Sequence, residues 1–240
     1  MSLLPAVALA ALLSLASWGA PVADVPPEAS GAAAAATLAP GGLAWGATPV
    51  RDSLTHYYVR NNVAGVRGLR RQARSREERL LVTYRLFPLT MDRGVIANIP
   101  SDAGVTSARE LALIAAHWAY RAANGPKINL PTHGRRSERI LNRAKEANAN
   151  DPYVLLVEGQ SLLYKPGIFG GDAAEAKAVF QRLKRALGSR GVTGLHPFEA
   201  DVWIWMCERK LNPSGANAMK RRLLARRPPP MFRQFLLDPP

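Results

Sequence analysis

Residues 151–187 constrain the fold more than any other stretch of the chain: DPYVLLVEGQSLLYKPGIFGGDAAEAKAVFQRLKRAL. Asp151 can cap a helix, and Pro152 suits the first turn because an N–H group at that position has no partner within the helix. A second helix is expected after Asp172, with Glu175 completing a capping-box-like pair. Its apolar residues recur at helical spacing: Ala176, Val179, Phe180, Leu183 and Leu187.

The segment between these two helices predicts a reversal of the chain. Pro166 ends the first helix, and Gly170-Gly171 allows backbone conformations that a side chain would disfavour. The stretch is therefore predicted to form a helical hairpin. Each helix carries an apolar face, so the hairpin requires neighbouring elements that cover it.

The second half of this stretch resembles a tetratricopeptide repeat (TPR). The residues that carry the resemblance are Gly171, Asp172, Glu175, Ala176, Phe180 and Leu187, with Gly159 on the first helix and with Ile140, Ala144, Ala147 and Pro152 as the end of a preceding repeat. The segment YKPGIFGGDAAEA, together with an apolar leader and the ending FLLDPP, resembles a group of exported bacterial TPR-like proteins. The resemblance implies a fold of stacked helical hairpins and no particular activity.

The rest of the chain is also predicted to be helical. Ser107 caps one helix and Gly125 follows its end, while Pro88 is expected to end an earlier helix. The expected helices cover residues 48–58, 77–87, 107–124, 137–149, 198–211 and 214–226, in addition to the hairpin. We therefore expect an all-α protein of eight to nine helices in antiparallel pairs, a TPR-like superhelix or short solenoid. The apolar tail PPPMFRQFLLDPP is expected to dock on the last helix pair, or to bind a partner.

Three regions are expected along the chain. Residues 1–19 contain an uncharged apolar run that is short for a membrane span and typical of a signal peptide. An uncleaved anchor or a buried helix is the alternative, and contact with a membrane is expected only if the leader stays uncleaved. Residues 20–47 are rich in Ala, Pro and Gly, which predicts a flexible tether. Residues 48–240 are expected to form a single helical domain, exported to the periplasm or secreted.

The chain is strongly basic, with a formal net charge of +14 over 240 residues. The densest basic segment contains Arg67, Arg70, Arg71, Arg74, Arg76 and Arg79, and a second basic face is expected over residues 220–227. One interpretation is a site for a polyanion such as nucleic acid, anionic lipid or an envelope polymer. The other is a solvated surface that reflects compositional bias, with Glu77 and Glu78 partly offsetting the positive charge.

No pattern in the sequence predicts catalysis. The four histidines are scattered, and Cys207 is the single cysteine, so neither a zinc site nor an internal disulfide is expected. The neighbours of Cys207 are apolar, which favours an inert, buried thiol. No phosphate-binding loop, nucleophile elbow or dinucleotide motif occurs. We expect no enzymatic activity, cofactor or metal; an enzyme with residues 90–105 as a lid is the third and weakest hypothesis.

The favoured hypothesis is a non-enzymatic exported scaffold that binds a protein or peptide partner in a groove. Groove residues are expected on the first helix of each pair, with Glu158 and Gln160 as candidates, and arginines would pair with acidic groups of the partner. The alternative is a polyanion-binding protein that uses the arginine clusters. Salt separates the two, because binding of a polyanion weakens steeply as ionic strength rises.

Overall fold

The computed structural model describes residues 48–189, 191–192 and 194–239, and this part of the chain is all α-helical. It contains ten α-helices and three short 3-10 helices, with a single isolated bridge between Val192 and Leu195 and no strand. The predicted signal peptide and tether lie outside the described residues. The expectation of an all-α protein is confirmed, with one helix more than the largest number expected.

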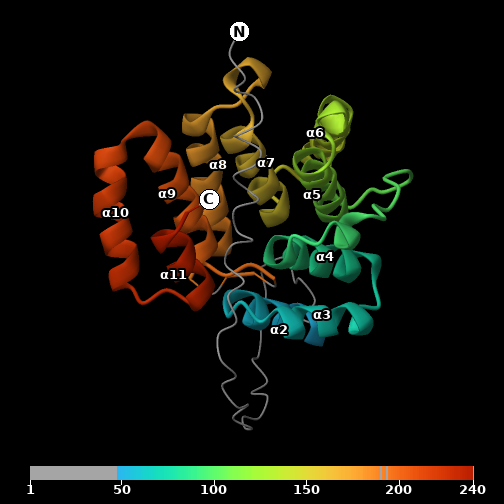
Figure 1. The fold of residues 1–240 in the computed structure, drawn as a ribbon, viewed down its shortest axis with the longest axis horizontal. Helices are drawn as coiled ribbons and strands as arrows, with labels where there is room; N and C mark the ends of the chain where they lie inside the picture. Colours follow the sequence, from blue (N-terminus) through green and yellow to red (C-terminus); the bar gives the residue numbers. More distant parts are fainter. Residues whose placement is uncertain (1–47, 190, 193, 240) are drawn as a thin grey trace.

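The helices follow one another through space in chain order (Figure 1). At the bottom of the view lie three helices: α2 (Pro49–Val59), α3 (Val63–Gln72) and α4 (Arg76–Thr90). Three hairpins succeed them from right to left: α5 (Ala108–Asn124) with α6 (Leu130–Asn148), α7 (Pro152–Tyr164) with α8 (Ala173–Leu187), and α9 (Phe198–Leu211) with α10 (Pro213–Ala225). The last helix is α11 (Pro230–Leu237).

Consecutive helices pack against each other throughout this array, as in a superhelix of helical hairpins. Helix α5 packs on α6 and α7, and α8 packs on both α7 and α9. Helix α11 packs on α9 and also on α2, which brings the last helix back to the first. The side-chain amide of Asn61 donates a 3.1 Å hydrogen bond to Gln234 Oε1 across this contact. The described helices therefore form an array whose two ends meet.

The central hairpin is built from the local signals in its sequence. The Asp151 carboxylate accepts a 2.8 Å hydrogen bond from the backbone of Tyr153, and Asp172 accepts one of 2.7 Å from Ala174, so both act as helix caps. The close approach of α7 and α8 depends on Gly159, because a Cβ atom there would lie 2.6 Å from the ring of Phe180. The glycine and the aromatic residue of the TPR-like pattern are thus packed against each other.

Two expected helix boundaries are wrong. Helix α4 does not end at Pro88 but continues to Thr90, where Met91 adopts a left-handed conformation with φ of 51°. Pro88 is tolerated because it lies in the last turn, where only one intrahelical hydrogen bond is lost. Helix α6 begins at Leu130, seven residues before Ser137, since Pro131 supplies a helical φ angle in its first turn. The basic helix near the C-terminus is α10, which begins at Pro213.

The segment between α4 and α5 is anchored to the core. It contains the 3-10 helix η2 (Arg93–Ile96), whose Val95 and Ile96 are buried. Further on, the Asp102 carboxylate forms a 2.6 Å ion pair with the guanidinium group of Arg143 on α6. These contacts join residues 95, 96 and 102 to the rest of the helical array.

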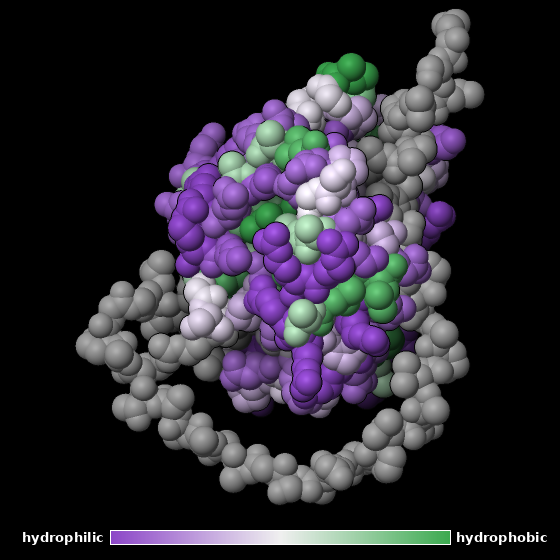
Figure 2. All heavy atoms as spheres, turned by 90° about the vertical axis from the view of Figure 1, so that its left-hand side faces the viewer, coloured by the Kyte–Doolittle hydropathy of each residue, from purple (hydrophilic) through white to green (hydrophobic). Residues whose placement is uncertain are grey.

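Figure 2 shows the face that includes α10, where hydrophilic side chains predominate and apolar ones form small separate patches. In the part of the chain that the structure describes, no helix is both long enough and apolar enough to cross a membrane.

Candidate functional site

A cavity of about 240 Å³ opens between the α5–α6 hairpin and α7. The 3-10 helix η4 (Gly167–Phe169), in the turn from α7 to α8, borders it on one side. We call this cavity the hairpin groove. Its lining residues are Ala116, Ala119, Tyr120, Ala122, Leu130, Pro131, Gly134, Arg135, Ser137, Glu138, Val157, Gln160, Ser161, Lys165, Pro166 and Phe169.

Small side chains leave this space open. Ala116 and Ala119 on α5 face Gly134 on α6, and a Cβ atom on Gly134 would meet no atom within 4 Å. Glycine inside a helix costs about 0.5–1 kcal/mol relative to alanine. Gly134 therefore lowers the stability of α6 without being required by its packing, and the effect of its missing side chain is a wider groove.

Gln160 supplies a polar group to the apolar interior of the groove. It is only 7% exposed, and its Oε1 atom accepts a 3.0 Å hydrogen bond from the hydroxyl group of Tyr84. Its amide nitrogen makes no hydrogen bond within the described residues, although Gln160 lines the groove. Tyr120 stacks on Tyr84 with ring centroids 5.7 Å apart, and burial raises the pKa of both hydroxyl groups well above the usual value. Both tyrosines are therefore neutral, and the Gln160 amide is available as a donor to a ligand.

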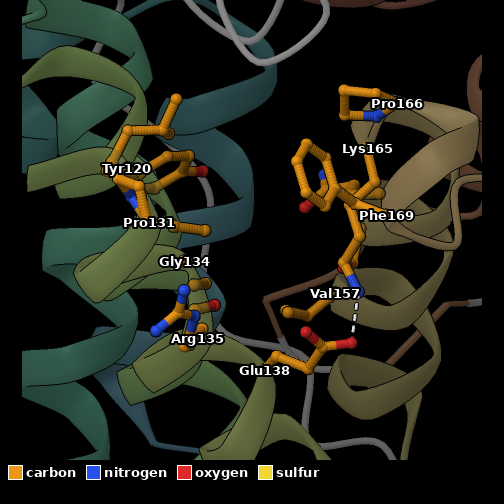
Figure 3. A pocket seen from close by; sticks show the side chains of 16 residues that line it. Tyr120, Pro131, Gly134, Arg135, Glu138, Val157, Lys165, Pro166 and Phe169 are labelled. Carbon is orange, nitrogen blue, oxygen red and sulfur yellow. Dashed lines mark hydrogen bonds and ion pairs between the residues drawn. The ribbon is translucent and has the colours of Figure 1, made fainter. Parts of the chain in front are cut away.

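Charged side chains lie at the mouth of the groove. Lys165 Nζ forms a 2.7 Å ion pair with Glu138 Oε1, which joins the end of α7 to α6 (Figure 3). Arg135 lines the same side as Glu138 and has no ion-pair partner among the described residues. Because Lys165 and Glu138 neutralise each other, Arg135 leaves the mouth with one positive charge in excess.

Exposed apolar side chains border the groove. Phe169 reaches from η4 toward the side formed by Tyr120 and Pro131 (Figure 3), and yet it is 62% exposed. Ile168 beside it is 85% exposed. So is Ile128, on the 3-10 helix η3 (Lys127–Asn129) that leads into α6. Of these three, only Phe169 lines the groove, and an exposed aromatic side chain beside a cavity is typical of an interaction site.

The structure separates the residues that the sequence suggested for a groove. Gln160 lines the hairpin groove, whereas Glu158 does not. The Glu158 carboxylate is almost fully buried and pairs with Lys145 on α6, so it joins two helices. Sequence reasoning missed Tyr120, Arg135 and Lys165. The small residues Ala116 and Ala119 on α5 and Gly134 on α6 are the sequence feature that could have indicated the groove.

The suggested arginines lie elsewhere. Arg67, Arg70 and Arg71 are exposed on α3, and Arg74 follows the end of that helix. Helix α3 lies at the bottom of Figure 1, whereas the turn between α7 and α8 lies at the top. These arginines and Gln160 therefore belong to two separate surfaces.

Cys207 and His117 are both fully enclosed by the core. Burial raises the pKa of the Cys207 thiol to about 12, and burial lowers the pKa of His117 to about 4. Within residues 48–239, apart from the two positions not described, no three His, Cys, Asp or Glu side chains cluster as metal ligands would.

Comparison with known proteins returned no match: no family model, no curated protein and no solved structure is similar to this chain.

Proposed function

We propose that this protein is a non-enzymatic TPR-like scaffold that binds an extended segment of a partner protein in the hairpin groove. The segment carries one large apolar side chain, which enters the groove, and an adjacent acidic side chain, which pairs with Arg135. We further propose that the scaffold is exported by the predicted signal peptide and acts in the cell envelope of a bacterium.

The observation that carries this proposal is the Gln160 amide. Its nitrogen makes no hydrogen bond to another described residue and is open to solvent in the groove, so a ligand that accepts from it replaces a water molecule there. A peptide carbonyl group in the groove would accept from the Gln160 nitrogen while Tyr84 keeps the Gln160 oxygen engaged. The surrounding wall is apolar, a combination of one oriented polar group and apolar surface that is typical of binding pockets.

The size of the groove supports a side chain as the occupant. Its volume of about 240 Å³ is below the roughly 300–1,000 Å³ of pockets that enclose drug-sized ligands. Phe169, which lines the groove and is 62% exposed, would contact the rest of a longer ligand. The positive charge of Arg135 favours an acidic residue next to the anchor.

The test places a small diazirine photo-crosslinking amino acid at Ala119, which lines the groove, in the full-length protein. The matched control carries the same amino acid at Ala178, which is exposed on α8. We expect crosslinks to a fluorescent peptide containing Asp-Leu-Phe-Glu from position 119 only, and none with Asp-Ala-Ala-Glu. A second variant, Gly134→Leu, fills the groove without a clash at Cβ and is expected to abolish the crosslink.

Equal crosslinking from positions 119 and 178, or an unchanged yield in Gly134→Leu, would contradict the proposed groove. Export is tested separately, by determining the N-terminus of the protein recovered from the cell envelope. A chain that begins near Ala20 is expected, and an intact Met1 in the cytoplasm would contradict export.

A further inference from the structure

Arg67, Arg70, Arg71 and Arg74 form a cluster on the surface of α3 and at its end. The first three are spaced i, i+3 and i+4, which places them on one side of the helix within about 6 Å of axial rise. Val66 and Leu69 of the same helix are buried. All four arginines are exposed, and none of their side chains forms an ion pair or hydrogen bond with another described residue. We call them the α3 arginine cluster.

The acidic residues nearest in sequence do not neutralise this cluster. Glu77 pairs instead with Arg51 on α2 at 3.1 Å and with Arg109 on α5 at 3.3 Å. Glu78 is buried, and its carboxylate accepts hydrogen bonds from Thr48 Oγ1 at 2.7 Å and from the Arg74 backbone at 2.9 Å. Neither carboxylate forms an ion pair with the side chain of Arg67, Arg70, Arg71 or Arg74. Folding directs them into contacts with other groups.

The surface beneath the arginines is hollowed. Ala64 and Gly68 lie between Arg67, Arg70 and Arg71 around a shallow depression. A Cβ atom on Gly68 would meet no other atom within 4 Å, so packing does not require a glycine there. The absence of side chains lets an anionic group approach the helix backbone with three guanidinium groups around it.

The residues around the α3 arginine cluster favour some classes of polyanion over others. The sequence VAGVRGLRRQ of α3 has no aromatic side chain on which bases could stack. The large apolar side chains that the described part of the chain exposes are Ile128, Ile168, Phe169, Leu211 and Leu237, and none of them is on α2 or α3. A helix that lies in a membrane interface needs such residues for insertion. A row of charges around a shallow depression suits phosphate groups strung along a chain.

We propose that the α3 arginine cluster binds a linear phosphodiester polymer through its phosphate groups, without selecting among bases. Each guanidinium group can donate two parallel hydrogen bonds to a phosphate. With three to four phosphates neutralised, log K should fall against log[salt] with a slope of about −2 to −3. Affinity should therefore drop by roughly 20- to 50-fold between 50 and 200 mM salt.

The test uses the full chain and two fluorescent probes, a 20-nucleotide oligothymidylate and a glycerol-phosphate polymer of similar length. The double variant Arg70→Gln/Arg71→Gln should weaken binding of both probes at least tenfold and reduce the salt slope by about 1.4. The matched control is Arg221→Gln/Arg222→Gln, which removes the same net charge from exposed positions on α10 and should change affinity less than twofold. Gly68→Leu keeps every charge, fills the depression and should weaken binding with little change in slope.

Equal losses in the two double variants would overturn the proposal, because they would show a response to net charge alone. It would also be overturned if neither probe bound at 50 mM salt, or if only anionic vesicles bound. Tighter binding of one probe would identify nucleic acid or an envelope polymer as the source of the phosphates. Circular dichroism of each variant verifies the fold, and the groove variant Gly134→Leu should bind both probes as the wild type does.

Discussion

The guanidinium group of Arg85 on α4 lies 2.7 Å from each carboxylate oxygen of Glu199 on α9, 114 residues further along the chain. Both side chains are almost fully buried. Arg85 also donates to the carbonyl group of Gly194 at 2.9 Å, and its guanidinium group lies 4.3 Å from the ring centroid of Tyr58. Burial alone would lower the pKa of Arg85, but the Glu199 carboxylate raises it well above the usual value. Arg85 therefore keeps its positive charge inside the protein.

Replacing Glu199 by glutamine is expected to lower the free energy of unfolding by about 3–5 kcal/mol, because Arg85 would keep a buried charge without its counter-ion. Urea denaturation measures the change. Glu146→Gln, at an exposed position on α6, is the control and should have an effect below about 0.5 kcal/mol. The double variant Arg85→Met/Glu199→Leu should recover most of the loss, and a double variant as unstable as the single one would contradict this account.

Two glycines on neighbouring helices should respond to alanine in opposite directions. Gly134→Ala is expected to raise stability by about 0.5–1 kcal/mol, since its Cβ atom projects into open space and α6 gains helix propensity. Gly159→Ala is expected to lower stability by about 1–3 kcal/mol, because the new methyl group would overlap the ring of Phe180. Thermal unfolding of the two variants provides the measurement. Shifts of the same sign in both would refute the packing described for α7 and α8.

His117 should make the protein sensitive to mild acid. Burial lowers its pKa from 6.5 to about 4, so the unfolded chain takes up the proton at a higher pH than the folded protein does. Its contribution to stability is present above pH 6.5 and is lost progressively as the pH falls toward 4, by about 3 kcal/mol in all. We expect the free energy of unfolding to fall more between pH 7.0 and pH 5.0 in the wild type than in His117→Leu. Urea denaturation curves at the two pH values measure this difference. An equal loss in both would exclude this histidine as the cause.

Cys207 should be inert in the folded protein. Its side chain is fully buried, and burial raises the pKa of the thiol to about 12, so very little thiolate forms at neutral pH. We expect no modification by iodoacetamide at pH 7.5 under native conditions and one modified cysteine per chain in 6 M guanidinium chloride. Mass spectrometry distinguishes these states. Rapid native labelling would show that α9 is exposed to solvent.

The helices could be predicted from the sequence because the signals that specify them are local. Asp151, Ser107 and Asp172 cap helices as expected, since a capping side chain bonds to backbone groups two or three residues away. The expected helix end at Pro88 and the expected helix start at Ser137 were wrong because proline is compatible with either end of a helix, and tertiary packing decides which.

The candidate sites were less predictable, because they depend on contacts between distant residues. Gln160 could be chosen as a residue on the first helix of a hairpin, but the groove around it requires α5 and α6. Likewise, the sequence places Glu78 close to several arginines but does not show that its carboxylate accepts a hydrogen bond from Thr48, 30 residues earlier. Position in the sequence does not reveal which charges folding leaves without partners.

The return of α11 to α2 has a consequence for how this array comes apart. An open stack of hairpins frays from its terminal units, since each unit contacts only its neighbours and the end units have one neighbour fewer. Here the hydrogen bond from Asn61 to Gln234 and the ion pair from Arg85 to Glu199 attach the final helices to the initial ones. Neither end can peel away alone, so amide hydrogens in α2 and α11 should exchange with solvent at rates close to those of the central hairpin.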